Sequence, residues 1–143
     1  MIVVDTTVLV YAVGTEHPLR EASRRLVEAF RQGRIHGTTT PEVIQEFAHV
    51  RARRRGRRNA ASLARDYALL LAPLLATEPA HVSDALALFE RHEALGAFDA
   101  LLAATAVAAD PDALVSADAA FDSVPRLRHV APGTPEFDAL VAG

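Results

Sequence analysis

The sequence predicts a single α/β domain with a short central, mainly parallel sheet of four to five strands and helices on both faces. Three observations predict this class. Short apolar or β-branched runs alternate with longer stretches of helical periodicity, and strands separated by helices form parallel sheets. The 143 residues are half hydrophobic and 23% charged, which suits one soluble domain with its own core. Gly and Pro stand between the expected elements, so residues 1–143 show no linker or repeat.

The first part of the chain contains two expected strands and three expected helices. Each assignment rests on periodicity bounded by turn or capping residues. The elements, in order, are a strand at Ile2–Val4, a short helix at Val8–Ala12 capped by Thr6 or Thr7, a helix at Leu19–Gln32, a strand at Ile35–Thr38 and a helix at Pro41–Arg54.

The second part of the chain continues the alternation of helices and strands. Its expected elements are a helix from a cap at Asn59 to Leu71, a helix at Ala80–Glu93, an almost wholly apolar helix at Phe98–Ala109, strands at Leu114–Val115 and Arg128–Val130, and a terminal helix at Pro135–Val141. In the second of these helices, spacing predicts that four large side chains point inward. They are Val82, Leu86, Leu88 and Phe89.

Composition excludes several kinds of chemistry. The chain has no Cys, which removes disulfides, thiolate metal sites and Cys nucleophiles. All fifteen basic residues are Arg, so the P-loop Lys and Schiff-base chemistry are absent as well. The longest stretch without a charged residue, Tyr67–Thr77, is too short to span a bilayer. We therefore expect a cytoplasmic protein without a membrane segment.

Three Asp residues stand where a core-forming sequence favours apolar or small side chains. Asp5 ends the first strand, and Asp118 lies just beyond the Leu114–Val115 strand. In parallel α/β sheets, ligands bind outside the carboxyl ends of the strands. Asp99 is the one charge in the first turn of a helix too apolar to face water. The alternative for Asp99 is a structural role, an acid favoured by the helix dipole.

A fourth acid is placed by the helical wheel of Pro41–Arg54. Val43, Phe47 and Val50 define its core stripe, and Glu46 lies about 60° from the centre of that stripe. Glu42 lies about 100° away and is expected nearer to solvent. Glu46 is thus the better candidate for a site, with an exposed rim residue as the alternative.

Together these acids predict a hard cation site. Four neighbouring carboxylates without His or Cys repel one another unless cations are present, and they suit Mg²⁺ or Mn²⁺ better than zinc. Such ions can activate water for phosphodiester cleavage. Thr6, Thr7 and Ser116 adjoin the acids and could orient them. The alternative is that these hydroxyls only cap helices and form turns.

Four segments carrying these acids resemble the motifs of the PIN domain, specifically of the VapC-type toxins. The segments are Ile2–Ala12, Thr40–Phe47 with its acid at Glu46, Phe98–Ala106, and Ser116–Asp122, where Asp122 competes with Asp118 as the fourth acid. The resemblance covers nearly the whole chain. It implies a three-layer α/β/α fold and a Mg²⁺-dependent endoribonuclease that cuts RNA at selected sites. It also implies a homodimer, neutralised by a small antitoxin whose tail covers the active site.

One basic cluster needs a separate explanation. Six Arg fall within eight residues, and the remaining nine Arg face all eighteen acids, so charge is strongly segregated. We expect this run to contact RNA phosphates or an acidic antitoxin tail; the alternative is a solvated turn at a helix end. The six are Arg51, Arg53, Arg54, Arg55, Arg57 and Arg58. The six His are scattered, and we interpret them as structural or surface residues.

Two other functions compete with the endoribonuclease. A phosphatase that forms an aspartyl-phosphate needs a second Asp two residues after Asp5, where Thr7 stands, and a Lys. A non-catalytic PIN-like module that binds RNA or a partner would not need all four acids.

Overall fold

The computed structural model describes all residues 1–143 and contains four short strands in one parallel sheet. The strands are β1 (Ile2–Val4), β2 (Gly37–Thr38), β3 (Ala113–Val115) and β4 (His129–Val130). Their order is β2-β1-β3-β4, with Val3 opposite Thr38 on one side and Leu114 on the other. Each strand is only two or three residues long.

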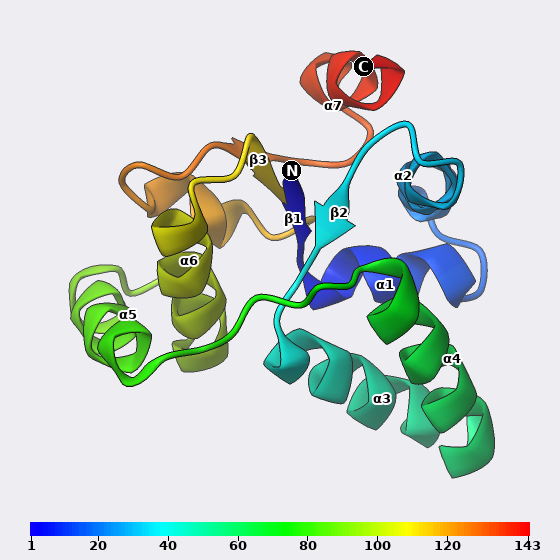
Figure 1. Ribbon diagram of the computed structural model, residues 1–143, viewed down its shortest axis with the longest axis horizontal. Helices are drawn as coiled ribbons and strands as arrows, with labels where there is room; N and C mark the ends of the chain where they lie inside the picture. Colours follow the sequence, from blue (N-terminus) through cyan, green and yellow to red (C-terminus); the bar gives the residue numbers. More distant parts are fainter.

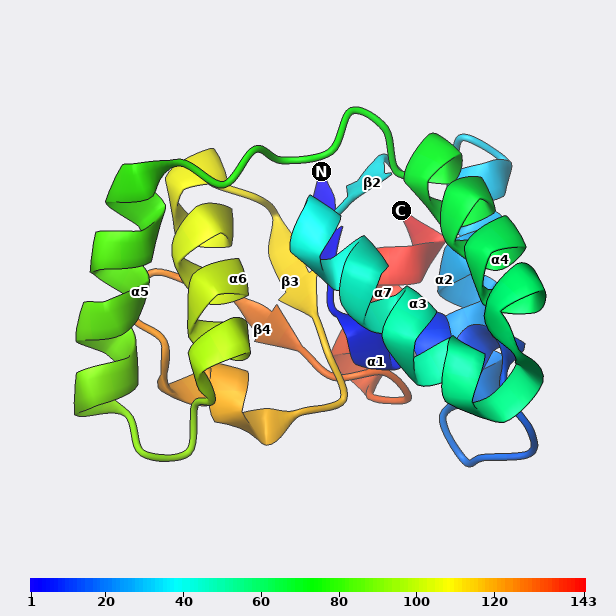
Figure 2. The same ribbon diagram turned by 90° about the horizontal axis from the view of Figure 1, so that it is seen from below.

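Seven α-helices and one 3₁₀ helix surround the sheet. They are α1 (Thr6–Val13), α2 (Arg20–Arg31), α3 (Pro41–Arg55), α4 (Arg57–Leu70), α5 (Pro79–Arg91), α6 (Ala97–Ala109), η1 (Ala119–Ser123) and α7 (Pro135–Ala142). The pairs α3–α4 and α5–α6 stand on opposite sides of the strands, joined by the extended segment 71–78 (Figures 1 and 2). The predicted α/β/α architecture with a parallel sheet is therefore confirmed.

The core forms where the apolar strands meet the helices. β1 and β3 are completely buried, as their continuous apolar sequences predict for central parallel strands. Large buried side chains from the helices and the 3₁₀ segment complete the core, among them Leu9, Phe47 and Phe121. No helix of the protein is both long and apolar enough to cross a membrane.

Three consecutive Thr residues carry the chain from β2 into α3 in the buried interior. The Thr38 hydroxyl donates to the Pro73 carbonyl at 2.9 Å, and the Thr39 hydroxyl donates to the Val4 carbonyl at 2.7 Å. Thr40 caps α3 by accepting a hydrogen bond from the Val43 amide. Each buried hydroxyl thus has a partner, and the bonds fix the start of α3 against the end of β1.

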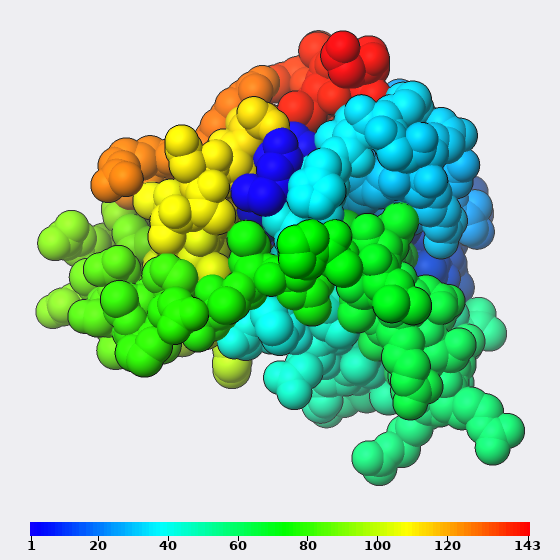
Figure 3. Space-filling model, in the orientation of Figure 1, coloured from blue at the N-terminus to red at the C-terminus, as the bar shows by residue number.

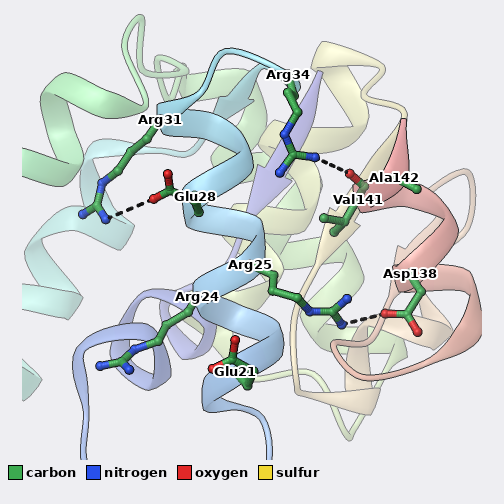
Figure 4. A pocket seen from close by; sticks show the side chains of 9 residues that line it. All are labelled: Glu21, Arg24, Arg25, Glu28, Arg31, Arg34, Asp138, Val141 and Ala142. Atoms are coloured by element: carbon green, nitrogen blue, oxygen red, sulfur yellow. Dashed lines mark hydrogen bonds and ion pairs between the residues drawn. The ribbon is translucent and has the colours of Figure 1, made fainter.

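The terminal helix α7 is fastened to α2 by polar contacts. Arg25 donates to Asp138 at 2.6 Å, and Arg34 donates to the carbonyl of Val141 at 3.1 Å (Figure 4). The cavity between the two helices is lined by four Arg and three acids, largely on α2. Arg25 and Arg31 pair with acids, and Arg34 bonds to the end of α7, so this cavity is best explained as a structural junction.

Two predicted helix caps are wrong. Asp5, not Thr6 or Thr7, precedes α1, and both Thr residues lie inside the helix with their hydroxyls bonded elsewhere. Asn59 does not cap α4 either, since that helix begins at Arg57 and the Asn59 side chain accepts a hydrogen bond from Arg51. In both cases tertiary hydrogen bonds outweigh the local capping preference of the residue.

The predicted inward face of α5 is also wrong. Val82, Leu86 and Phe89 are 44%, 59% and 48% exposed, Leu88 is half-buried, and only Ala85 is fully buried. α5 forms the outer member of the α5–α6 pair and packs mainly on the small side chains of α6 (Figure 2). A close helix–helix contact needs small residues, so the large side chains of α5 turn outward.

Candidate active site

Asp5 lies at the carboxyl end of β1, at the first residue of the turn into α1. The residue is 3% exposed, and its side chain makes no capping hydrogen bond to the helix. Instead Oδ2 accepts hydrogen bonds from the hydroxyls of Thr7 at 3.0 Å and Ser116 at 2.7 Å. Oδ1 has no protein donor and is available to the adjoining cleft. A buried carboxylate that forgoes its helix cap and keeps one free oxygen is suited to binding a cation.

Ser116 and Thr7 also hold the neighbouring loop that follows β3. The Ser116 hydroxyl accepts from the Asp118 amide at 3.0 Å, and the Thr7 hydroxyl accepts from the Ala117 amide at 3.1 Å. Each hydroxyl therefore donates to Asp5 and accepts from the loop. These contacts couple the ends of the adjacent strands β1 and β3, so Asp5 and Asp118 cannot shift independently.

The structure separates the two candidates for the fourth acid. Asp118 is exposed, caps the 3₁₀ helix η1 through the Ala120 amide, and lies near enough to Asp99 to affect its pKa. The Asp122 carboxylate instead pairs with His129 at 2.6 Å. The second ring nitrogen of His129 lies 2.8 Å from the Ser116 carbonyl. Asp122 thus supports the loop from behind, while Asp118 belongs to the acidic group.

Glu46 enters the site from α3. Its Oε2 accepts a hydrogen bond from the Thr6 hydroxyl at 2.8 Å, which ties α3 to the first turn of α1. The exposures predicted from the helical wheel are reversed. Glu46 is exposed because it faces the open cleft, whereas Glu42 is half-buried because the segment before α5 covers it and Thr77 donates to its carboxylate at 3.0 Å.

Asp99 occupies the first turn of α6 and is half-buried. Its carboxylate does not cap the helix, and no amide, hydroxyl or guanidinium group of the protein donates to it. Burial first, then the negative charges of Asp5, Asp118 and Glu46 and a hydrogen bond with Asp118, together raise the pKa of Asp99 to about 7. The shift shows that the four acids from two strand ends and two helices act on one another. It also places Asp99 near half-protonation at neutral pH.

No cation of the protein neutralises this group. None of the ion pairs in the structure involves Asp5, Glu46, Asp99 or Asp118. No three His, Asp or Glu side chains form a ready-made metal cage, as expected for carboxylates that repel one another. The donor set nevertheless fits Mg²⁺ or Mn²⁺, because it offers only carboxylate oxygens, several of them without a protein donor.

The acids open into a cleft of about 500 Å³ between α3 and α6. Asp5, Glu46 and Asp99 line it, while Asp118 lies outside its lining on the loop after β3. Eight further lining residues were not among the predicted site residues, among them Gln45, His49 and Phe98. His49 could have been found from sequence, because it lies one turn after Glu46 on the same side of α3. For Phe98 the signal was a large aromatic side chain next to Asp99.

The Arg run forms the tip where α3 turns into α4 at Gly56. Gly56 has a φ of 84°, a conformation that suits glycine and allows this tight turn. The tip projects from the rest of the molecule, and long side chains extend from it (Figure 3). Arg51 differs from the others, since it is half-buried and donates to Asn59 and to the Val13 carbonyl. The five exposed Arg form no ion pair with any acid.

Two of these Arg face a groove that adjoins the acidic cleft at His49. Arg53 and Arg57 line the groove between α3 and α4, whose floor is formed by four Ala residues. His49 lines both this groove and the acidic cleft, so the two are adjacent. The exposed Arg54, Arg55 and Arg58 complete the tip beyond the groove.

Comparison with known proteins shows to which family this chain belongs. Residues 2–127, which include all four acids and the Arg tip, match the family model for the PIN domain. This chain belongs to the PIN domain family. The resemblance seen in its four sequence motifs is therefore confirmed, and its relatives place it with the VapC-type PIN domains.

Relatives of this PIN domain match it over most of their length. It is 52% identical over 136 residues to Ribonuclease VapC7 of Mycobacterium tuberculosis, with 92% of each chain covered. It is 35% identical over 135 residues to Ribonuclease VapC13 of the same species, covering 92% of this chain and 100% of the relative. A chain in the crystal structure of VapBC2 from Rickettsia felis bound to a promoter DNA fragment shares the fold, with a TM-score of 0.68 and 19% identity over 92% of this chain and 99% of that one.

Proposed function

We propose that this PIN domain is a metal-dependent endoribonuclease that acts as the toxin of a toxin–antitoxin pair in the cytoplasm. The observation that carries the proposal is the group of four carboxylates without a cation, at the carboxyl ends of β1 and β3 and in the first part of α3 and α6. The names of its VapC relatives support RNA as the substrate.

In the proposed mechanism Asp5, Glu46, Asp99 and Asp118 hold Mg²⁺, with Mn²⁺ as an alternative. When bound, the cation supplies Lewis-acid activation of water and of the phosphodiester. Asp5 provides its unbonded Oδ1, while the hydroxyls of Thr7 and Ser116 keep its other oxygen fixed. Fixed carboxylates lower the reorganisation needed during the reaction.

Thr6 and Asp99 have complementary tasks in this mechanism. The Thr6 hydroxyl orients Glu46 by its bond to Oε2, which leaves Oε1 without a donor from the protein. Asp99, whose pKa is raised to about 7, must lose its proton before it can bind a cation. Cation affinity should therefore weaken as the pH falls below neutrality.

The Arg tip is proposed to hold the phosphate backbone of the RNA. Arg53 and Arg57 lie on a groove that meets the cleft at His49. An RNA strand with its phosphates in this groove would therefore run toward the acids. Guanidinium groups bind phosphate oxygens with two parallel hydrogen bonds, and Arg54, Arg55 and Arg58 add positive charge beyond the groove. Arg51 is tied into the fold and is assigned a structural role within the run.

We also propose two protein partners, an antitoxin and a second copy of this chain. VapBC2 of Rickettsia felis, a complex by its name, has a chain with this fold, which supports a cognate antitoxin as inhibitor. A homodimer is proposed as well, supported by the exposed apolar side chains on the outer face of α5, which a second copy could bury. Sedimentation of the purified chain, alone and with a candidate antitoxin, tests both.

The decisive experiment is cleavage of a mixed single-stranded RNA with Mg²⁺, with Mn²⁺ and with EDTA. The proposal expects internal cuts with either cation and none with EDTA. Binding of RNA without cleavage under all conditions would instead favour a non-catalytic PIN-like module. Cleavage that is unaffected by EDTA would contradict the metal-dependent mechanism.

A further inference from the structure

Phe98 is the most exposed large hydrophobic residue of the protein. The residue is 81% exposed in the first turn of α6, directly before Asp99, and it lines the acidic cleft. An aromatic ring in this position adds almost nothing to the core. Leu101 and Leu102, from the same helix, extend the apolar side of the cleft. The cleft therefore has an apolar, aromatic wall on α6 next to the acids.

The opposite wall has a different character. Gln45 and His49 on α3 line the cleft there with groups that donate and accept hydrogen bonds. Beyond His49 begins the groove with Arg53 and Arg57. The surface thus presents an aromatic ring, then carboxylates, then polar side chains, and finally guanidinium groups. This surface suits a polynucleotide. The aromatic ring matches the apolar faces of the bases, and the guanidinium groups match the phosphates.

We propose that Phe98 is a platform on which a nucleobase of single-stranded RNA stacks, beside the acids that would hold the cation. The inference rests on the proposed function and adds to it a binding residue and a substrate class. Stacking on an aromatic ring needs a base that is not already stacked in a duplex, and it tolerates any base because every base has a π face. The cleft then selects unpaired RNA through Phe98.

The absence of Trp from the chain allows a direct optical test. Phe98→Trp gives the protein one indole at the proposed platform, and Leu69→Trp gives a matched control. Leu69 is 78% exposed on α4 and does not line the cleft. Titration with a short mixed-sequence single-stranded RNA, in a Glu46→Gln background to suppress cleavage, should quench the indole emission of the Phe98→Trp protein and leave that of the control nearly unchanged. The same sequence as a duplex should quench much less.

Three variants separate stacking from simple apolar contact. Phe98→Ala should weaken binding of the single-stranded RNA about tenfold, the usual effect of losing one stacked base. Phe98→Leu keeps apolar area but has no ring, so it should bind as weakly as Phe98→Ala. Phe98→Tyr should bind like the wild type. In cleaving enzyme the loss should appear mainly in KM, because Phe98 contacts the base and not the reacting atoms.

Other results would overturn the proposal. If Phe98→Leu binds RNA like the wild type, the ring is not a stacking platform. If Phe98→Ala leaves RNA binding unchanged but alters the mass of the protein in solution or its affinity for the antitoxin, Phe98 belongs to a protein interface. Failure of the proposed function is a separate outcome: quenching in the Phe98→Trp protein, without RNA cleavage by the chain that keeps Glu46, would retain the platform and reject the nuclease.

Discussion

The acidic cleft and the Arg tip are the two charged regions of this protein, and they are constructed in opposite ways. Asp5 is buried, and hydroxyls from two different segments fix one of its oxygens. Arg53 and Arg57 extend from exposed helix ends and form no ion pair. Both regions lack counterions within the protein, but only the acidic group has charged side chains fixed by hydrogen bonds, namely Asp5, Glu46 and Asp118.

The difference shows what each region needs for its proposed task. A cation site requires several oxygens at fixed separations, which only a rigid framework can supply. Phosphates along a flexible RNA can be bound by mobile cations, since the attraction is long-range and needs little geometry. Changes in the acidic cleft should therefore have large, specific effects, and changes in the Arg tip should have small, additive ones.

The largest effect is expected from removing one negative charge at the cleft. Asp99→Asn and Asp5→Asn should each lower RNA cleavage by more than about 100-fold, because even a residue that only orients a ligand contributes about 10- to 100-fold. Cleavage with Mg²⁺ is measured beside Asp66→Asn, an exposed acid on α4 outside the cleft that should behave like the wild type. Normal cleavage by Asp99→Asn would make Asp99 a structural helix residue.

A second comparison separates the acids after β3. Asp118→Asn should lower cleavage strongly, because its charge belongs to the group around Asp99. Asp122→Asn should lower cleavage less than about tenfold, roughly the lower end for a residue that supports a ligand indirectly. It removes only the partner of His129, which holds the Ser116 carbonyl from behind. The reverse order of the two variants would assign the fourth acid to Asp122.

Intermediate effects are expected from the hydroxyls that fix Asp5. Thr7→Val keeps the shape of the side chain but removes the bond to Asp5 and leaves the Ala117 amide without its acceptor. We expect a decrease in cleavage of about 10- to 100-fold together with weaker Mg²⁺ binding. Thr105→Val is the matched control, because its hydroxyl bonds only within α6. An active Thr7→Val would show that burial alone positions Asp5.

The raised pKa of Asp99 predicts a pH-dependent stability in EDTA. The unfolded chain releases this proton near pH 3.8 and the folded protein only near pH 7, so stability falls as the pH rises between these values and stays lower above them. Asp99→Asn should lack this decrease and exceed the wild type by about 1 to 2 kcal/mol at about pH 8, since solvent weakens the effect of each pKa unit. Urea unfolding of both proteins across this pH range measures the difference in the free energy of unfolding.

Thermal melts of the same two proteins test cation binding and the alternative role of Asp99. Mg²⁺ should raise the melting temperature of the wild type, because a ligand that binds only the folded state stabilises it, and should affect Asp99→Asn much less. A metal-free Asp99→Asn protein that is several kcal/mol less stable than the wild type would contradict the repulsion among the acids and favour a structural cap.

The smallest effects are expected at the Arg tip. The double variant Arg53→Gln with Arg57→Gln should weaken RNA binding a few-fold. The slope of log K against log salt concentration should become shallower by about 0.7 for each phosphate that is no longer bound. Arg54→Gln with Arg55→Gln is the matched pair outside the groove and should change the slope of the salt dependence less. Cleavage positions should not change, since phosphate contacts carry no sequence information. An unchanged slope with weaker antitoxin binding would assign the tip to the antitoxin.

The sequence by itself determined the fold class, most of the elements and the acids that form the site. Continuous apolar strands such as Ile2–Val4 must be buried, and an acid directly after such a strand or at Asp99 conflicts with that burial. These are local conflicts between residue type and environment, so they are visible in the sequence. The motifs around the acids then led to the family that the comparisons confirm.

Tertiary structure alone decided which polar groups meet. The choice of Asp118 over Asp122 depends on His129, which reaches Asp122 from a neighbouring strand. The exposures of Glu42 and Glu46 depend on Thr77 and on an open cleft, neither of which a single helical wheel contains. Thr6 prefers a cap locally but donates to Glu46 on α3, and the Thr7 hydroxyl accepts from the Ala117 amide after β3. Local preferences are worth about 1 kcal/mol, and contacts between distant segments outweigh them.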